Sequence, residues 1–516
     1  MTKKKTKRVD VRSVMEGQWA AKRQKFYASG APLSLLLLGL FVVASSIVLT
    51  GDRQTVLGVR HGNWRQLQDL LQVTALMLVL SLALGLYIAA YQRRIVKNHL
   101  RGSVLLTSLL IMIAVVRLGV IYQLTPYLIV VPVMIMAVMM TIAYSQRFAL
   151  GITSFLALVT VLALRESENP ETFEQAFAVL LTTGSGICIT ILLLKEIRTR
   201  SKLIEVCGLA GVVVFAMVWL TGWWQGTMDR MVILRQSLWA GGGAVSIGFI
   251  MQGLLPVIER IFRTATSLTL LDYGEATKPL LERLAVEAPG TFNHSWQIGM
   301  LSEAAAKAIG ADGLLCRVGS YYHDVGKLNK PHYFVENQGE RLNQHKELAP
   351  TMSRMIIVGH VKDGLELARE YKLPRLLHQF IATHHGTTLV EYFYHEATKN
   401  DSENTRAFTE ADFRYPGPKP SSKEAAIVML TDAVESATRA MQDPTPNRIE
   451  NVVREVDMKR LQDGQFDECD LTMRELHLIE NSLIKSLCGM YHGRIAYPKQ
   501  EKLEKRKSAS IIKAQV

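Results

Sequence analysis

Runs of about twenty apolar residues fill the first half of the chain, between residues 31 and 255. Lipid offers no water to pair with backbone polar groups, so such a run is stable only as a helix that satisfies its own hydrogen bonds. Charged residues and histidines collect in the second half instead. The sequence therefore predicts an all-α protein, in which a polytopic transmembrane helical bundle is followed by an all-helical cytoplasmic domain.

Windows of apolar residues indicate eight membrane-spanning helices. Basic side chains collect in the N-terminal tail and in the loops at residues 92–102 and 195–202, whereas glutamates occupy the loop at residues 166–174. Because positively charged loops remain on the cytoplasmic side, this alternation places the C-terminal half in the cytoplasm. The predicted spans lie near residues 31–49, 71–91, 103–122, 126–144, 147–164, 176–194, 207–224 and 233–255.

The formal net charge of +13 and the first apolar run each have two interpretations. A basic surface can bind nucleic acid, but the basic residues here flank the apolar runs, which favours membrane topology and anionic lipid.

The first apolar run follows a basic region and ends near Ala44, as a cleaved signal peptide does. Its length, and the tail of about thirty residues before it, favour a retained anchor.

Beyond Pro256 the pattern changes to amphipathic helices, without the alternation that is typical of strands. The proline- and glycine-rich segment 401–422 predicts a loop. The five cysteines show no paired spacing, which predicts neither a disulfide framework nor a zinc knuckle. The predicted helices cover residues 295–309, 313–323, 352–361, 375–384, 423–441, 448–461 and 472–491.

These patterns divide the chain into four parts. We expect a basic tail (1–30), a membrane domain (31–255) with a short outer loop near residues 50–70, a soluble domain (256–500) and a second basic tail (501–516). Roughly 235 residues are enough for the soluble domain to bury a full core. The outer loop, at about twenty residues, is too short to fold by itself.

Five histidines and two aspartates of the second half form a set that could hold metal ions. Imidazole and carboxylate ligands together favour iron, manganese or zinc over calcium or magnesium. The set exceeds the needs of one ion, so two ions that share a carboxylate and a hydroxide are expected, and they would supply a nucleophile near neutral pH and hold phosphate oxygens. The candidate ligands are His294, His323, Asp324, His360, His384, His385 and Asp432.

Six short motifs accompany these residues. They are Glu287-Ala288-Pro289-Gly290-Thr291, His323-Asp324-Val325-Gly326-Lys327, Phe334-Val335-Glu336-Asn337-Gln338, His384-His385-Gly386, Tyr415-Pro416-Gly417-Pro418-Lys419-Pro420 and Leu430-Thr431-Asp432-Ala433-Val434-Glu435. In this order they resemble the HD phosphohydrolase superfamily, and more narrowly the bacterial seven-transmembrane HD proteins of the PgpH type. The resemblance covers the tail, the membrane block and nearly all of the soluble domain.

Proteins of that type hydrolyse cyclic di-AMP. The resemblance therefore implies a membrane-anchored, metal-dependent phosphodiesterase that opens cyclic di-AMP to linear pApA, with its HD domain on the cytoplasmic side of the bacterial inner membrane. It implies two ions, iron or manganese, with Asp324 between them as a catalytic carboxylate. His294, His323, Asp324 and Asp432 would hold one ion, and His360, His384 and His385 the other. Relatives of this type usually carry a large extracytoplasmic domain where this chain has its short outer loop.

Four further residues are candidates for catalysis or substrate contact. Lys327 follows Asp324 by almost one helical turn, where its ammonium could neutralise phosphate oxygens; the alternative is a solvated lysine at a helix end. We expect Gly326 to help terminate the helix that carries His323. Weaker candidates for substrate contact are Tyr415, Lys419 and Arg439. The run Gly241-Gly242-Gly243 predicts close helix packing rather than a phosphate-binding loop.

Two other functions remain open. A cyclic di-GMP phosphodiesterase of the HD-GYP type would share the metal chemistry, but its Gly-Tyr-Pro signature is absent after His385, where Gly386-Thr387-Thr388 follows. A membrane receptor that binds the nucleotide without hydrolysis would favour a degenerate ligand set, whereas each ligand of the family finds its residue type here. The expected partners are a cyclic dinucleotide and the lipid bilayer, with no nucleic-acid polymer, and a homodimer is left open.

Overall fold

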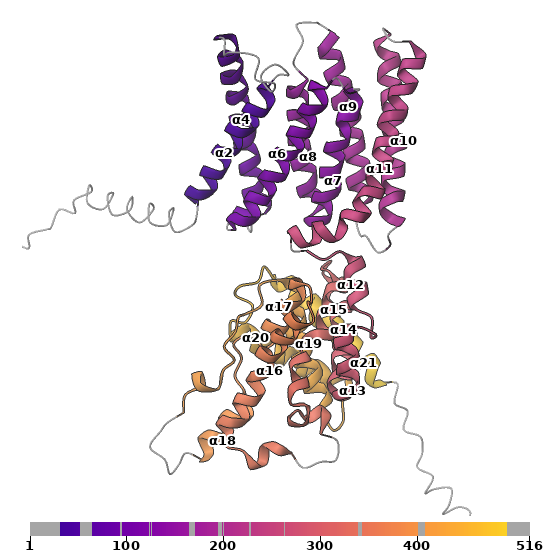
Figure 1. Cartoon of the computed structure of the whole chain (residues 1–516). Helices are drawn as coiled ribbons and strands as arrows, with labels where there is room; N and C mark the ends of the chain where they lie inside the picture. The colour runs from indigo at the N-terminus through magenta and orange to yellow at the C-terminus, as the bar shows by residue number, and fades with distance from the viewer. Residues whose placement is uncertain are drawn as a thin grey trace, which may run out of the picture. The chain divides into compact units, whose positions relative to one another are not determined.

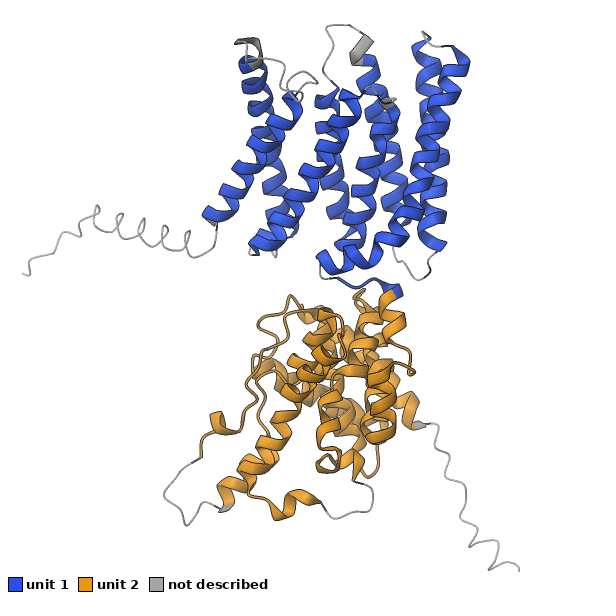
Figure 2. Cartoon of the chain, viewed as in Figure 1, with its two compact units in different colours: residues 1–268 blue, residues 269–516 orange. Residues whose placement is uncertain are grey.

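The structure, a computed structural model, divides the chain into two compact units, residues 1–268 and 269–516 (Figure 2). It describes residues 31–51, 64–92, 95–96, 98–122, 124, 126–164, 171–194, 199, 201–226, 229–262, 264–338, 343–400 and 408–492. The predicted tails, most of the outer loop and most of the charged loop residues lie outside these ranges. Within them the regular elements are all helices, and the only β pairing is an isolated bridge between Leu389 and Arg414. The predicted all-α class is confirmed.

The first unit is a bundle of apolar helices (Figure 1). Seven of its described helices are long and apolar enough to cross a membrane. They correspond to seven of the eight predicted spans. Their bounds are α2 (Ala31–Thr50), α4 (Trp64–Tyr91), α6 (His99–Ile121), α8 (Gln146–Ala163), α9 (Glu171–Leu193), α10 (Ser201–Gln225) and α11 (Arg230–Phe262).

The remaining predicted span, near residues 126–144, forms a shorter element. A 3-10 turn, η1 (Pro126–Ile129), leads into α7 (Val130–Ala143), which has 14 residues. α7 packs against α8, α9 and α11, and most of its side chains are buried among them. With a rise of about 2.0 Å per residue in η1 and 1.5 Å in α7, the element measures about 29 Å, close to the thickness of a bilayer core.

Glycines of α11 allow this helix to pack closely against α10 and α7. A Cβ atom on Gly241 in α11 would lie 2.9 Å from the carbonyl oxygen of Gly211 in α10, and one on Gly243 would lie 2.8 Å from a methyl of Val131. The expected close helix packing is thus confirmed at these two positions. Gly242 faces open space. α11 also continues through Pro256, where the amphipathic pattern was expected to begin, and ends at Phe262.

Arg117 joins the ends of three helices within the bundle. Its side chain, on α6, is buried and donates hydrogen bonds to the carbonyl oxygen of Gly51 (3.0 and 2.8 Å) and to that of Ala163 (3.1 Å). Gly51 directly follows α2, and Ala163 is the last residue of α8. Carbonyls at helix C-termini lack partners within the helix and carry partial negative charge. The buried guanidinium therefore supplies hydrogen bonds and positive charge to both helix ends.

We expect Arg117→Leu to lower the free energy of unfolding by about 2 to 4 kcal/mol, because one buried and one partly buried carbonyl lose a charged donor. Thermal unfolding of the purified protein in detergent measures this loss, with the reactivity of the buried Cys207 thiol as the signal for unfolding. Lys202→Ala, which removes only an exposed ion pair with Glu205, is the control. An Arg117→Leu variant as stable as this control would show that the guanidinium does not hold the helix ends together.

The second unit holds the helices of the predicted soluble domain (Figure 1). Seven of them match the seven predictions for this region, with boundaries that shift by at most two residues except that α14 begins six residues earlier and α16 ends nine residues later. The sequence analysis missed α12 (Ser267–Tyr273), α13 (Pro279–Glu287) and α18 (Glu391–Asn400). The matching helices are α14 (Pro289–Ala308), α15 (Gly313–Tyr322), α16 (Pro350–Glu370), α17 (Arg375–Thr383), α19 (Lys423–Arg439), α20 (Pro446–Gln462) and α21 (Met473–His492).

α19 is the central helix of this unit. It packs against α14, α15, α17 and α20, and six successive residues at its start, 425–430, are buried on all sides. A helix that is apolar around its whole circumference belongs in a core. Short 3-10 helices connect the longer ones: η2 (Val325–Asn329), η3 (Pro331–Tyr333), η4 (Val335–Asn337), η5 (Gln344–Glu347) and η7 (Glu410–Phe413). The described part of the predicted loop 401–422 contains only η7.

Two carboxyl groups meet between α20 and α21. Burial and the neighbouring Glu480 raise the pKa of Asp457 from 3.8 to about 8. A carboxyl whose pKa is raised on folding stabilises the fold below its ordinary pKa, and this contribution is lost as the pH rises through the folded pKa. We therefore expect the free energy of unfolding to fall between pH 4 and pH 8.

Asp457→Asn should flatten this part of the pH profile, because the amide does not ionise. Chemical unfolding of the wild type and the variant at pH 5 and pH 8 compares the two. Asp467→Asn, at a carboxyl that is 71% exposed, is the control and should keep the wild-type profile. If Asp457→Asn changes stability equally at both pH values, the ionisation of Asp457 is not the cause of the slope.

Candidate metal centre

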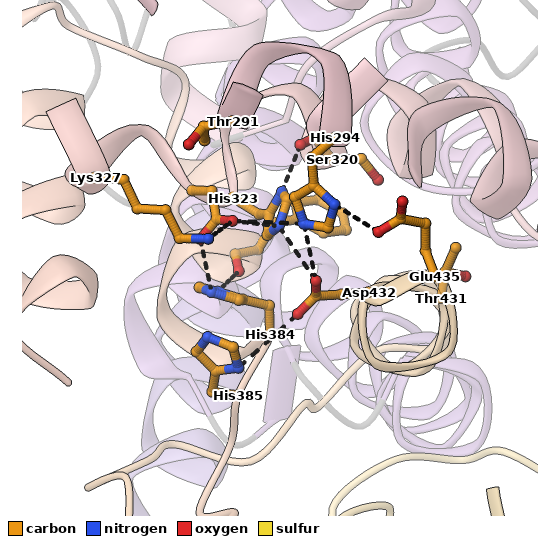
Figure 3. A network of polar contacts seen from close by, with 12 residues as sticks. Thr291, His294, Ser320, His323, Lys327, His384, His385, Thr431, Asp432 and Glu435 are labelled. Atoms are coloured by element: carbon orange, nitrogen blue, oxygen red, sulfur yellow. Dashed lines mark hydrogen bonds and ion pairs between the residues drawn. The ribbon is translucent and has the colours of Figure 1, made fainter. Parts of the chain in front are cut away.

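All seven candidate ligands lie together inside the second unit. Figure 3 labels five of them, His294, His323, His384, His385 and Asp432. His294 lies in the second turn of α14, His360 in α16 and Asp432 in α19, whereas the other four follow directly after α15 or α17. Six are buried, and His385 is partly exposed. Helices that are distant in sequence thus converge on one polar site inside an otherwise apolar core.

Asp324 lies between two groups of histidines. Its Oδ2 is 3.2 Å from His323 Nε2 and 3.7 Å from His294 Nε2. Its Oδ1 is 3.3 Å from His360 Nε2 and 3.5 Å from His384 Nε2. Each carboxylate oxygen therefore faces one group. The two clusters with metal-ligand spacing are His294, His323 and Asp324, and Asp324, His360, His384 and His385.

Asp432 approaches the first of these clusters. Its Oδ1 is 3.1 Å from His294 Nε2 and 3.9 Å from His323 Nε2, and its Oδ2 is 3.9 Å from His385 Nδ1. Asp432 therefore lies nearest to His294 and at equal distance from His323 and His385.

Four of the histidines are oriented by hydrogen bonds from Nδ1. Because an Nδ1–H donates to a protein oxygen in each case, Nε2 carries the free lone pair and points into the centre, as metal-ligating histidines do. Three acceptors are backbone carbonyls, and the fourth is a carboxylate. They are Ser320 for His323 (2.6 Å), Ile357 for His360 (2.5 Å), Phe380 for His384 (3.0 Å) and Glu435 for His294 (2.7 Å).

The residues present fit metal ions. His360 Nε2 and His384 Nε2 are 3.1 Å apart, although both are lone-pair acceptors in this tautomer. His323 Nε2 and Asp324 Oδ1 are buried without a hydrogen-bond partner in the described part of the chain. Buried acceptors that face one another are costly unless a cation lies between them. The donor set suits a transition metal better than calcium or magnesium.

The protonation states agree with this interpretation. Burial lowers the pKa of His360 to about 3 and that of His385 well below its usual value, so both are neutral, as metal ligands must be. Burial alone would raise the pKa of Asp324, but the interactions with His323 and Lys327 outweigh it and hold the carboxyl ionised. His294 is the exception: hydrogen bonds to Asp432 and Glu435 overcome the effect of burial and raise its pKa to about 9, so a metal ion would have to displace its proton on binding.

Lys327 is fixed between two carboxylates. Its Nζ is 2.6 Å from Asp324 Oδ2 and 2.7 Å from Glu336 Oε1, and these charges raise its pKa although burial opposes them. Thr291 Oγ1 donates to the same glutamate oxygen (3.2 Å), so the motifs around residues 291 and 336 interlock. The alternative of a solvated lysine at a helix end does not describe this side chain, which is 12% exposed.

The three weaker candidates occupy different places. The ring of Tyr415 stacks on His385, with 4.3 Å between centroids, and is buried. Arg439 Nε lies 3.7 Å from Glu435, the partner of His294. Lys419 donates to the carbonyl oxygen of Gly464 (2.7 Å), beyond the end of α20. Tyr415 and Arg439 thus adjoin residues of the centre, whereas Lys419 holds the proline-rich loop to α20.

Gly326 has a different role from the one expected. α15 already ends at Tyr322, and Gly326 lies inside η2. A Cβ atom here would lie 1.8 Å from the carbonyl oxygen of His360. The expected role as a helix terminator is therefore wrong, since this position needs glycine to let η2 contact α16.

A cavity of about 370 Å³ opens beside the centre. Candidate residues of the centre form one side, and α19, α20 and the segment after α17 form the rest. The sequence analysis did not single out the lining residues of α20 or the supporting residues Glu336 and Glu435. The lining residues are Lys327, His385, Leu389, Glu391, Asp432, Ala433, Ser436, Val456, Lys459 and Arg460.

Comparison with known proteins places this centre in a family. Residues 67–266 match the family model described as a 7TM receptor with intracellular HD hydrolase, and residues 291–437 match the HD domain. The first range contains six of the described α-helices in full, α7 among them, and most of α4.

Curated relatives match both parts. Cyclic-di-AMP phosphodiesterase PgpH of Bacillus subtilis is 38% identical over 413 residues, which are 78% of this chain and 55% of the relative. The protein of that name from Listeria monocytogenes is 35% identical over 361 residues, 69% of this chain and 48% of the relative. The chain therefore spans about half the length of the curated relatives it matches.

A solved structure matches the second unit. The crystal structure of the PgpH HD domain of L. monocytogenes in complex with cyclic-di-AMP is 45% identical, with a TM-score of 0.40, and the match covers 42% of this chain and 100% of that chain. The two family models cover both the apolar bundle and the HD domain, and the curated relatives carry the same combination over most of this chain. The chain therefore belongs to the family of seven-transmembrane proteins with an HD hydrolase domain.

Proposed function

We propose that this protein is a membrane-anchored, metal-dependent phosphodiesterase that hydrolyses cyclic di-AMP to linear pApA. The observation that carries the proposal is the position of Asp324, whose two buried oxygens each face a separate group of histidine nitrogens. Two curated relatives are cyclic-di-AMP phosphodiesterases, and this similarity supports cyclic di-AMP as the substrate. No residue that would read adenine rather than guanine is evident among the cavity-lining side chains, so the base preference rests on those relatives.

The distances around Asp324 and Asp432 support a division of the ligands between two ions. His294, His323 and Asp432 would hold one ion and His360, His384 and His385 the other, with Asp324 shared between them. Histidine-rich sites of this kind suit iron or manganese. When bound, two such ions supply a hydroxide nucleophile near neutral pH and compensate the charge of a phosphate.

The chain's own residues orient the substrate and stabilise its charge. Lys327 lines the cavity while Asp324 and Glu336 hold its ammonium in place, so its positive charge lies where non-bridging phosphate oxygens would approach. In the overall reaction water adds to phosphorus, the bond from phosphorus to the ribose 3′-oxygen breaks, and that oxygen leaves with a proton. The product is linear pApA with a free 3′-hydroxyl.

The HD domain would lie on the cytoplasmic side of a bacterial inner membrane. The seven long apolar helices and the 29 Å element of η1 and α7 give about eight crossings, which return the second unit to the side of the N-terminus. The basic residues of the loops at 92–102 and 195–202 favour that side.

The full chain, purified in detergent and loaded with Mn²⁺ or Fe²⁺, tests the proposal. We expect it to convert cyclic di-AMP to pApA faster than it cleaves cyclic di-GMP, and to lose this activity after treatment with a chelator. Faster cleavage of cyclic di-GMP would overturn the substrate assignment. Tight binding of cyclic di-AMP by the metal-loaded protein without linear product would show a receptor and not an enzyme.

A further inference from the structure

Arg460 lines the cavity beside the metal centre but has no partner of its own. It lies in the last turn of α20, on the same cavity wall as Val456 and Lys459. Its Nε is buried without a hydrogen bond, and its guanidinium makes no ion pair within the described part of the chain. Arginine stays charged in proteins, so this is a partly buried positive charge with no direct partner among the described residues.

The nearby acidic groups are already occupied. Glu391 pairs with Lys459 (2.5 Å), Asp463 pairs with Arg414 (2.9 Å), and Asp432 belongs to the metal centre. Burial lowers the pKa of the Arg460 guanidinium in spite of these neighbouring negative charges. A cavity wall that retains such a group at a cost in stability fits a binding site for an anion.

The other cations that line the cavity are not free in this way. Lys327 is held by two carboxylates, and Lys459 is held by Glu391. A cyclic dinucleotide carries two phosphodiester groups, each with one negative charge. When one of them lies at the metal centre beside Lys327, the second needs a cation elsewhere in the cavity.

We propose that Arg460 binds the phosphodiester that is not being hydrolysed. The planar guanidinium offers two parallel N–H donors that match the oxygens of a phosphate. The inference rests on the proposed function, because it takes a cyclic dinucleotide as the ligand. It assigns to α20 the recognition of the substrate as a molecule with two phosphates, a role that the metal ligands alone cannot perform.

Steady-state kinetics of Arg460→Met in the metal-loaded full chain tests this assignment. Loss of charged hydrogen bonds to a group that is bound equally in the ground and transition states should raise KM for cyclic di-AMP by about 10- to 100-fold and leave kcat within about threefold. Arg460→Lys should recover part of the loss. The control is Arg454→Met on the same helix, which removes an exposed arginine paired with Glu450 and should leave KM unchanged.

Thermal unfolding separates binding from a structural role. Removing this partly buried charge should leave the melting temperature of the ligand-free Arg460→Met variant equal to that of the wild type or higher, with unchanged metal content. Suppose that the wild type hydrolyses cyclic di-AMP. The inference then fails, while the proposed function stands, if Arg460→Met shows any one of three results: an unchanged KM, a decrease in kcat alone, or a lower melting temperature. Absence of turnover in the wild type would refute the proposed function itself.

Discussion

Replacing Asp324 with asparagine is expected to remove both metal ions and abolish hydrolysis of cyclic di-AMP. The carboxylate offers one oxygen to His294 and His323 and the other to His360 and His384, so a single substitution weakens both sites. The amide keeps the size of the side chain but offers only one good acceptor and no charge. Metal analysis should find roughly two ions per chain in the wild type and few in the variant.

The same substitution has a second consequence at Lys327. Its ammonium loses one of its two carboxylate partners and keeps only Glu336, which weakens its fixed position beside the centre. Asp272→Asn removes an aspartate that pairs with Lys278 on the surface of the same unit and should retain metal and turnover. A variant of Asp324 that keeps both ions and wild-type turnover would refute the shared position of this carboxylate.

The ligands could be predicted from the sequence because metal chemistry requires particular residue types in a recognisable order. Their supports could not. Glu435 orients His294 across 141 residues of sequence, and only the packing of α14 against α19 brings the two side chains together. Glu336 lies within a motif but had no assigned role, and Arg460 lies in no motif. The role of Glu336 follows from its ion pair with Lys327, and that of Arg460 from the absence of a direct partner within the described residues.

The fold was predictable where hydrophobic periodicity extends over several turns. The matching helices of the second unit are amphipathic over nine or more residues, and the long apolar runs of the first unit became helices. α12 was missed because seven residues give too few periods to distinguish a helix from a loop. α13 and α18 are as long as the predicted α17 and α15, so their length does not explain why they were missed. α7 shows the opposite limit, since its apolar sequence looks like a full span although its α-helical part has only 14 residues.

Gly326 shows why a residue within a recognised motif can be assigned the wrong role from sequence. A glycine after a helix usually suggests a helix cap. Here the constraint comes from α16, whose His360 carbonyl oxygen lies where a Cβ atom would be, and whose Gly364 amide nitrogen lies 2.5 Å from the same point. Both obstacles are backbone atoms, which cannot rotate away.

We therefore expect Gly326→Ala to separate η2 from α16 and to lower the free energy of unfolding by roughly 3 kcal/mol or more. Because η2 follows directly after Asp324, and the clashing carbonyl belongs to His360, the same shift should move two ligands of one cluster apart and reduce metal content and turnover together.

Gly359→Ala is the matched control. Gly359 lies on α16 directly before His360, but its Cβ position is surrounded by open space. Alanine there should raise stability by about 0.5 to 1 kcal/mol through its helix propensity and leave metal content unchanged. Thermal unfolding and metal analysis compare the two variants. Equal stability and equal metal content in both would mean that the approach of η2 to α16 does not set the geometry of the centre.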